Sequence, residues 1–545
     1  MADEIQSYKL VCSGGLNSNQ NHLYLSEAAS GAATRLINYE PSLYGGYRRI
    51  EGYDLLGGLD VEVGAGVAEG PVLCVAIYRN EHIGNPYIIA ARKDAGANSY
   101  KFYKFVDLVG WQAMTNSLTL NHTANSRTVT KIRHAQWDFG SGSHIAFADG
   151  VNNAIIFDGL NWYQLNNTNT GGTASPGGNQ IVNAPALIDV FENHLFLGGD
   201  LGSRAVICHS APSDPFDFTT ASGGAQITPG FNVVQFKPFR DDLFVFGTTA
   251  IKKISPDVTA GFVLDQVTAN VGCIARDSVL EIGGDLMFLA PDGFRPVSGT
   301  SRIGDVELET ISKPIQVTLV NLINNYDMDT INGVVIRSKS QVRYFVGDSG
   351  TDVVDSYGII GGLANQGGQI GWEFGELIGF RASCTTSDYI GTEEFVLHGD
   401  YNGKVYREDV GTSFSGNDIL SVYATPYLDF GDTEVRKTMR KVNTFVRAEG
   451  PVELFLSMAY DWGDYNTARP SSYSQESLGG PVEYGGLNID YAGANILYGG
   501  NSKPIMTSDI QGSGFSARAT FVTVGQSEPF SIQGLVFEFS ISGRR

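Results

Sequence analysis

Two clusters of basic side chains are the residues of this chain whose types and spacing could do chemistry. The first is the pair Arg48 and Arg49, set in the aromatic and glycine-rich stretch YGGYRRIEGY. Arginine suits desolvated ion pairs and aromatic stacking. We therefore interpret the pair as a contact with a neighbouring protein, and the alternative is a turn whose two arginines are solvated.

The second cluster is the run EVRKTMRKV, which places four cations within six positions: Arg436, Lys437, Arg440 and Lys441. A solvated strand-turn face is the simpler interpretation. The functional interpretation is a contact with an acidic patch on an adjacent subunit, which this acidic chain could itself supply.

Motifs for catalysis are missing from the sequence. It contains no G-x-S-x-G, no H-E-x-x-H and no G-x-x-x-x-G-K-[ST]. Its eight histidines are scattered, and its five cysteines lie far apart without a C-x-x-C pair. We therefore predict no catalytic residue, no metal site and no cofactor, and we predict that the protein is not an enzyme.

Composition and charge restrict the fold class and the partners. The 545 residues include 67 glycines and 11 % aromatics but only 17 % charged residues, which favours short strands joined by glycine turns over long helices. A formal charge of −21 disfavours tight binding to DNA, because such binding needs cations that replace phosphate counterions. The N-terminus lacks the pattern of a signal peptide, and no apolar run approaches the ~18 residues of a membrane helix. We expect a soluble all-β protein, folded in the cytoplasm, without membrane insertion.

Short apolar runs that end in Gly/Asp turns repeat along the middle of the chain. From Phe147 to Leu397 they recur every 43 to 57 residues, as in HIAFADG, HLFLGGD and DLFVFGT. A four-stranded propeller blade takes roughly 40–50 residues. We predict a β-propeller of six or seven blades over residues 70–410, with each run as an inner strand.

One segment inside this region has a helical pattern instead. In ISKPIQVTLVNLINNYD, Ser312 is placed to cap a helix, and one face of that helix carries Ile315, Leu319, Val320 and Ile323. We expect a single helix packed between blades.

The two ends of the chain differ from the repeats. Residues 411–545 contain longer runs with period-two alternation, such as PVELFLSMAYD, which predict a β-sandwich-like platform domain. Residues 1–69 have few strand patterns, and we expect them to complete this platform or to clamp a neighbour.

The order of several blocks resembles the tail nozzle proteins of short-tailed bacteriophages, the tail tubular protein B and packaged-DNA-stabilisation group. The blocks are GGLNSNQNHLYLSEAASGAATRLINYEPSLYGGYRRIEGY, FENHLFLGGD, RAVICHSAPSDPFDFTTASGG, FKPFRDDLFVFGTTAIKKI and VGCIARDSVLEIGGDLMFLAPDGFRPVSG, followed by ELETISKPI. They cover roughly residues 10–60 and 185–320. They are degenerate apolar-turn patterns, and their order is more specific than any one of them.

This resemblance implies a virion tail protein, assembled in the host cytoplasm, that forms a hexameric ring below the portal and the adaptor. It implies tail fibre or tail-tip proteins alongside, and duplex DNA that is retained in the lumen and then passes through it without tight binding. It supplies no catalytic residues. The alternative from a different class is a carbohydrate-binding or carbohydrate-cleaving β-propeller, such as a host-receptor module.

Overall fold

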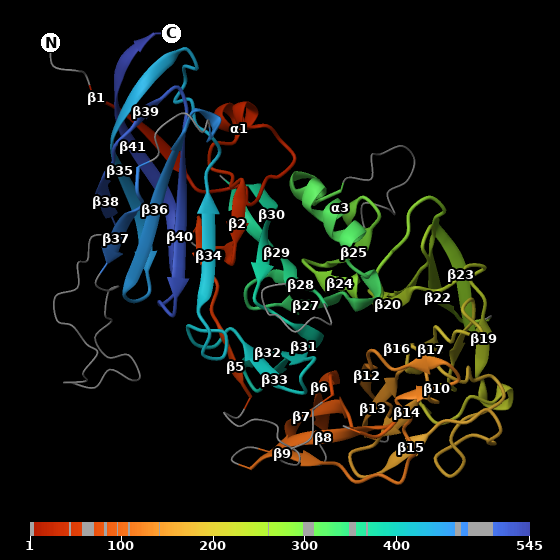
Figure 1. Cartoon of the computed structure of the whole chain (residues 1–545). Coiled ribbons are helices and arrows are strands. Elements are labelled where there is room, and N and C mark those ends of the chain that lie inside the picture. Colours follow the sequence, from red (N-terminus) through yellow and green to blue (C-terminus); the bar gives the residue numbers. More distant parts are fainter. Residues whose placement is uncertain are drawn as a thin grey trace.

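A computed structural model of the chain describes thirteen stretches: residues 5–42, 45–56, 70–80, 84–94, 96–106, 109–140, 142–259, 261–297, 310–347, 356–366, 369–463, 470–477 and 505–544. Almost every regular element in them is a β-strand. Figure 1 shows a ring of small sheets at one end of the molecule and a pair of large sheets at the other. The all-β class predicted from composition is confirmed.

Six small antiparallel sheets are the separate blades of a β-propeller. The first blade contains β6 (Val72–Asn80), β7 (Gly84–Lys93), β8 (Tyr100–Val106) and β9 (Gly110–Ala113). The second contains β12 (Arg133–Asp138), β13 (Ser143–Ala148), β14 (Ile155–Phe157) and β15 (Trp162–Gln164). The third blade contains β16 (Leu187–Phe191), β17 (His194–Gly198), β18 (Ile207–His209) and β19 (Ala225–Ile227). The fourth contains β20 (Gln235–Phe239), β21 (Asp242–Phe246), β22 (Ile251–Asp257) and β23 (Gly261–Thr268). The fifth blade contains β24 (Leu280–Ile282), β25 (Asp285–Ala290) and β26 (Gly293–Pro296). The last contains β31 (Ala382–Ile390), β32 (Glu393–Asp400), β33 (Val405–Glu408) and β5 (Tyr53–Leu55).

The position between the blades of β24 and β31 belongs to a larger sheet. Four strands there continue the propeller: β27 (Asn332–Ile336), β28 (Gln341–Val346), β29 (Tyr357–Gln366) and β30 (Gln369–Ile378). β27 contacts both β24 and β31, and β31 in turn lies beside β6 of the first blade. The propeller is therefore a closed ring. One of its radial positions, formed by β27–β30, is part of the nine-stranded sheet that continues into the platform.

The repeated apolar runs are mostly second strands rather than inner strands. HIAFADG, HLFLGGD and DLFVFGT fall on β13, β17 and β21, while β12, β16 and β20 lie nearer the axis. A second strand is covered by a strand on each side and by the neighbouring blades, so it is the most apolar strand of its blade. The innermost strand lines a polar cavity and carries charged side chains, which corrects the assignment made from the sequence.

Two large sheets form the platform. The nine-stranded sheet continues from β30 through β2 (Arg35–Ile37), β34 (Ile419–Ala424), β40 (Ala517–Gly525), β36 (Val452–Tyr460) and β37 (Tyr473–Ser477). The seven-stranded sheet contains β3 (Tyr39–Pro41), β4 (Tyr47–Arg49), β41 (Phe530–Arg544), β35 (Val435–Ala448), β38 (Ile505–Asp509), β1 (Ile5–Val11) and β39 (Ser513–Gly514). One apolar core joins both sheets, with Leu454 and Phe521 from the first and Val442 and Phe537 from the second. This is the sandwich-like domain predicted for the C-terminal part.

The N-terminal segment is divided between the two halves of the molecule. β1 and β4 pair with β41, and β3 pairs with β4. In contrast, β5 pairs with β33 and supplies the fourth strand of the last blade. The domain division into 1–69, 70–410 and 411–545 stays a prediction. Strand pairing crosses it, because β2 lies between β30 and β34.

The predicted helix is present as α3 (Gln316–Asn325), preceded by the short turn η3 (Lys313–Ile315). Its packing face is Ile315, Leu319 and Leu322, while Val320 is exposed. The Ser312 hydroxyl does not cap the helix; it accepts a hydrogen bond from the Phe294 N–H at 2.9 Å. The only other α-helix in the described residues is α1 (His22–Ala28). Among these residues, no helix is long and apolar enough to cross a membrane.

Candidate functional site

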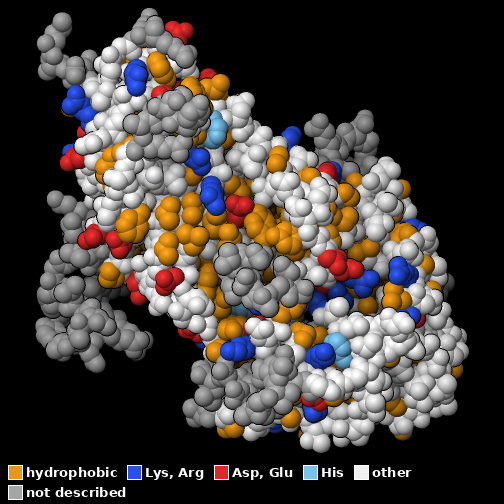
Figure 2. All heavy atoms as spheres, in the orientation of Figure 1, with side chains coloured by type: hydrophobic (Ala, Val, Ile, Leu, Met, Phe, Trp, Pro, Cys, Tyr) orange, Lys and Arg blue, Asp and Glu red, His pale blue; other side chains and the backbone are white. Residues whose placement is uncertain are grey.

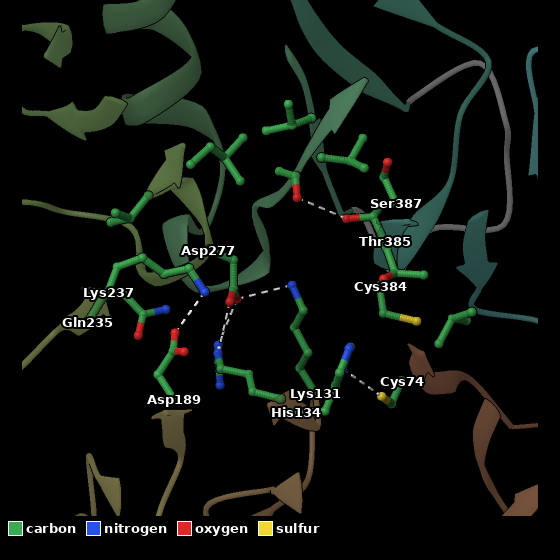
Figure 3. A pocket seen from close by; sticks show the side chains of 18 of the residues that line it. Cys74, Lys131, His134, Asp189, Gln235, Lys237, Asp277, Cys384, Thr385 and Ser387 are labelled. Carbon is green, nitrogen blue, oxygen red and sulfur yellow. Dashed lines mark hydrogen bonds and ion pairs between the residues drawn. The ribbon is translucent and has the colours of Figure 1, made fainter. Parts of the chain in front are cut away.

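A hollow lined by charged side chains lies where the inner strands of the propeller meet. Its volume is about 320 Å³, and its wall is formed by side chains from all seven radial positions. The charged, histidine and cysteine residues of the wall are Cys74, Lys131, Arg133, His134, Asp189, Lys237, Asp277, Glu281, Arg337 and Cys384. Figure 3 shows Lys131, Lys237 and Asp277 converging on the same space.

Asp277 is the centre of the charged groups in this axial cavity. It belongs to the turn η2 (Arg276–Ser278), just before β24. Both carboxylate oxygens accept hydrogen bonds from the Arg133 guanidinium, at 2.8 and 2.7 Å, and Lys131 Nζ lies 3.1 Å from Oδ2. A separate pair, Lys237 Nζ and Asp189 Oδ2, is 2.7 Å apart.

These contacts fix the protonation states in the cavity. Burial alone would raise the pKa of Asp277, but the Arg133 and Lys131 cations hold that pKa well below its usual range. Burial, together with the positive charges of Lys237 and Lys131, lowers the pKa of His134 to about 4. At neutral pH the carboxylate is therefore ionised and the imidazole is neutral.

Cys74 and His134 form a pair of the nucleophile–base type in the wall. Cys74 Sγ and His134 Nδ1 are 3.6 Å apart. Burial raises the pKa of the Cys74 thiol well above its ordinary value, so the sulfur stays protonated. A protonated, buried thiol next to a neutral imidazole is a packed pair rather than an activated nucleophile.

Arg49 does not reach a neighbouring protein. Its side chain is fully buried, and it donates to the Ile419 and Gly525 carbonyls at 3.1 and 2.6 Å and to the Ser421 hydroxyl at 3.2 Å. Alternation along β4 places Arg49 on the same side as the buried Tyr47. This corrects the interface predicted at Arg49: the residue connects strands within the platform.

Arg48 also contacts its own chain. Its guanidinium lies 2.7 Å from each of the carboxylates of Glu40, Glu51 and Glu449. Burial opposes the charge, but these three carboxylates raise the pKa of Arg48 above its ordinary value. The ion pairs of Arg48 are therefore with its own chain, and its contact with a neighbouring protein stays a prediction.

Arg48 belongs to a larger cluster between platform and propeller, which we call the junction network: Glu40, Arg48, Glu51, Lys339, Arg343, Glu408, Asp409 and Glu449. Arg343 is at its centre and is 2.9 Å from Glu408 and 2.7 Å from Asp409. The side chains of Arg343 and Glu408 have no exposed surface. Burial alone would raise the pKa of Asp409, but Arg343 and Lys339 lower it to about 2.

The run on β35 divides by strand alternation. Lys437 is buried like Val435 and Met439, and its Nζ donates to the carbonyls of Phe515, at 3.0 Å, and Asp432. Burial lowers its pKa. Lys437 is thereby removed from the predicted interface.

The other three cations of the run lie at the surface. Arg436 and Arg440 are exposed and bond to the nearby Ser513 and Ser540, and Lys441 Nζ lies 3.8 Å from Asp509. For these three residues an intersubunit contact stays a prediction.

Comparisons with known proteins give no family for the chain. No protein-family model matches it, and no curated protein matches it. One solved structure that resembles it is described as an ancestral GH74 enzyme, with a TM-score of 0.36 and 10 % sequence identity. The match covers 68 % of this chain and 51 % of that one, about half its length. A TM-score this low carries no argument about function.

The sequence analysis did not predict the charged residues of the axial cavity or Arg343 at the centre of the junction network. Lys131, Arg133 and Lys237 lie in KIRHAQWD and FKPF, where cations interrupt strand-like patterns. That interruption is a signal for a polar inner strand.

Within the described ranges, no three His, Cys, Asp or Glu side chains are grouped to hold a metal ion.

Proposed function

We propose that the protein is a structural component of a bacteriophage tail: the nozzle below the portal and adaptor, with six copies forming a ring around the path of the genome. The resemblance of residues 10–60 and 185–320 to that family is the starting point of the proposal. In this function the chain is a scaffold that retains and then guides duplex DNA, and it catalyses no reaction.

The observation that carries the proposal is the continuous β-structure between propeller and platform. One sheet runs from β27, in the wall of the axial cavity, to β37 at the platform edge. β5 ties the N-terminal segment back into the last blade. The ladder hydrogen bonds of a shared sheet resist relative motion better than a flexible linker does, and a component of a pressurised conduit needs that resistance.

The charges of the axial cavity favour a structural role over glycosidase activity. A glycoside hydrolase needs one carboxyl group with a raised pKa as general acid, near a second carboxylate. Asp277 has the opposite property, because Arg133 and Lys131 keep it ionised. These ion pairs hold the inner strands together, and Asp277 is not able to act as the protonated general acid.

The net charge fits a conduit that DNA crosses without binding tightly. Six chains at −21 carry six times that charge, or −126. Acidic walls repel duplex DNA within a Debye length of about 8 Å at physiological salt, and they do not hold its phosphates.

We expect the purified protein to form rings of six-fold symmetry, alone or after addition of its adaptor. Mass photometry gives the copy number, and two-dimensional class averages from electron microscopy give the symmetry. The same preparation should release no reducing sugar from bacterial polysaccharides. If the protein stays monomeric with its adaptor, or if it cleaves a polysaccharide, the nozzle proposal is wrong and the carbohydrate-active alternative is favoured.

The exposed part of the β35 run supplies a second test. Replacing Arg436, Arg440 and Lys441 with serine should flatten the dependence of ring assembly on salt, because exposed intersubunit ion pairs are screened. Lys437 is kept, since it is buried. Assembly is measured by mass photometry between low and high salt.

A matched control variant replaces three exposed cations outside β35 with serine: Lys101, Arg204 and Lys313. It should keep the wild-type salt slope. If the β35 variant also keeps that slope, these cations are solvated and contribute nothing to assembly.

A further inference from the structure

A second hollow lies beside helix α3, away from the propeller axis. Its volume is about 220 Å³, and it opens between α3 and the paired strands β29 and β30. Six lining side chains can recognise a ligand: Thr318, Asn321, Asn325, Tyr326, Tyr357 and Glu376. None of them belongs to the axial cavity or to the junction network.

Two tyrosines form one wall of this α3 hollow. The rings of Tyr326 and Tyr357 are nearly parallel, with an interplanar angle of 10° and a centroid separation of 6.2 Å. The Tyr326 N–H donates to the Leu322 carbonyl at 3.1 Å, which places Tyr326 at the C-terminal cap of the helix. Both side chains are half-buried, so each ring packs on the protein and keeps part of its surface accessible.

A half-buried carboxylate stands next to the rings. The Tyr357 hydroxyl donates to Glu376 Oε1 at 2.7 Å. Within the described part of the chain, no residue donates a hydrogen bond to Oε2. Burial raises the pKa of Glu376, against the opposing effects of Tyr357 and the Arg35 cation. A carboxylate with one hydrogen bond in such a place has spare acceptor capacity.

The helix contributes two carboxamides. Asn321 and Asn325 are four residues apart, so both lie on the face of α3 that borders the hollow. Both are exposed, and neither is hydrogen-bonded to another residue of the described ranges. The Thr318 hydroxyl donates to Ser18 Oγ at 2.9 Å, which leaves it able to accept.

We propose that the α3 hollow binds a single pyranose unit of a carbohydrate. The tyrosine rings offer apolar surface to the C–H face of the sugar. Glu376 Oε2 accepts from a hydroxyl group, and the two carboxamides offer both donors and acceptors to neighbouring hydroxyls. The hollow is smaller than the roughly 300–1,000 Å³ of sites for drug-sized ligands, which fits one sugar ring of a chain that continues into solvent.

An alkylammonium group is the competing ligand chemistry, because aromatic rings and a carboxylate also attract cations. The exposed carboxamides favour the sugar, since an alkylammonium carries no hydroxyls for them to bind. This site does not depend on the proposed nozzle function: a tail protein with it contacts surface glycans, and a carbohydrate-binding protein uses it directly.

The test is saturation-transfer NMR and calorimetry on the full-length protein with methyl pyranosides of glucose, galactose, N-acetylglucosamine and rhamnose, and with tetramethylammonium. We expect at least one pyranoside to bind with millimolar affinity. Tyr326→Ala and Asn321→Ala should each weaken that binding at least fivefold. Asn321 is an exposed helix residue, so its variant keeps the fold whatever happens at Tyr326.

Matched controls are Asn324→Ala, an exposed neighbour on α3 outside the hollow, and Tyr24→Ala, an exposed tyrosine on α1. Both should bind as the wild type does. The proposal is overturned if no pyranoside shows saturation transfer, if tetramethylammonium binds more tightly than every pyranoside tested, or if Asn321→Ala and Asn324→Ala bind alike.

Discussion

Replacing Arg343 with alanine is expected to lower the free energy of unfolding by about 3–5 kcal/mol, the cost of removing one partner from a buried ion network. Arg343 has no exposed surface and contacts three carboxylates, of Glu408, Asp409 and Glu40. Without the guanidinium, these carboxylates stay buried with less positive charge near them. Urea unfolding followed by far-ultraviolet circular dichroism measures the loss.

Arg337→Ala is the matched control, because Arg337 precedes the same strand but its side chain is 55 % exposed. Its loss should stay below about 1 kcal/mol. Arg343→Lys keeps the charge without the planar fork, so it should be intermediate. If Arg343→Ala is no less stable than Arg337→Ala, the junction network does not stabilise the fold.

The pH dependence gives a second readout of the same variant. Asp409 has a folded pKa of about 2, below the unfolded value, so its contribution is present above about pH 4 and is lost at lower pH. In Arg343→Ala, Asp409 loses one of the two cations that lower its pKa, so it protonates at a higher pH than in the wild type. The difference in stability between wild type and variant should therefore shrink as the pH falls from about 4 toward 2.

Asp277→Ala is the second substitution with a large expected effect, again a loss of about 3–5 kcal/mol. It leaves Arg133 and Lys131 as unpaired cations at the wall of the axial cavity. Because η2 precedes β24 and Arg133 opens β12, the lost contact joins two blades that are far apart in sequence. Urea unfolding at pH 7 measures the effect.

Acid unfolding identifies the cause of that loss. The folded pKa of Asp277 lies below its unfolded value of about 3.9. Its contribution is therefore present above about pH 4 and is lost as the pH falls toward the folded pKa. The wild type should lose stability over that range more steeply than the variant does.

Asp189→Ala is the matched control in the same cavity. Its partner Lys237 is 42 % accessible, so water can solvate the cation that remains. The loss should be clearly smaller than for Asp277→Ala. Equal losses in both variants would mean that burial of the partner cations does not determine the effect.

Local patterns in the sequence were enough to predict the fold class. Turns such as Asp149-Gly150 are local: the Asp149 carboxylate accepts from the N–H groups of Val151 and Asn152, and Gly150 has a φ of +78°. Period-two alternation likewise belongs to a single strand. These signals need no knowledge of distant residues, so the propeller, the sandwich-like platform and helix α3 could be predicted from them.

The alternation of side chains along a strand also predicts that two of the candidate residues are buried. Lys437 lies between Val435 and Met439 on one face of β35, and Arg49 shares a face with Tyr47 on β4. Their basic character predicts exposure, whereas their position in the strand period predicts burial. Buried cations bonded to backbone carbonyls are uncommon, and the sequence contains no sign of the distant carbonyls that accept their hydrogen bonds.

Only the tertiary structure decided which charges meet. Arg343 and Glu40 are 303 residues apart, Arg133 and Asp277 are 144 apart, and Tyr357 and Glu376 come together only through the register of β29 with β30. Which strand stands nearest the propeller axis was also decided there, because that depends on how the blades close. The sequence by itself determined the kinds of elements. The junction network, the axial cavity and the α3 hollow come from contacts between residues far apart in the chain, whose partners no local pattern specifies.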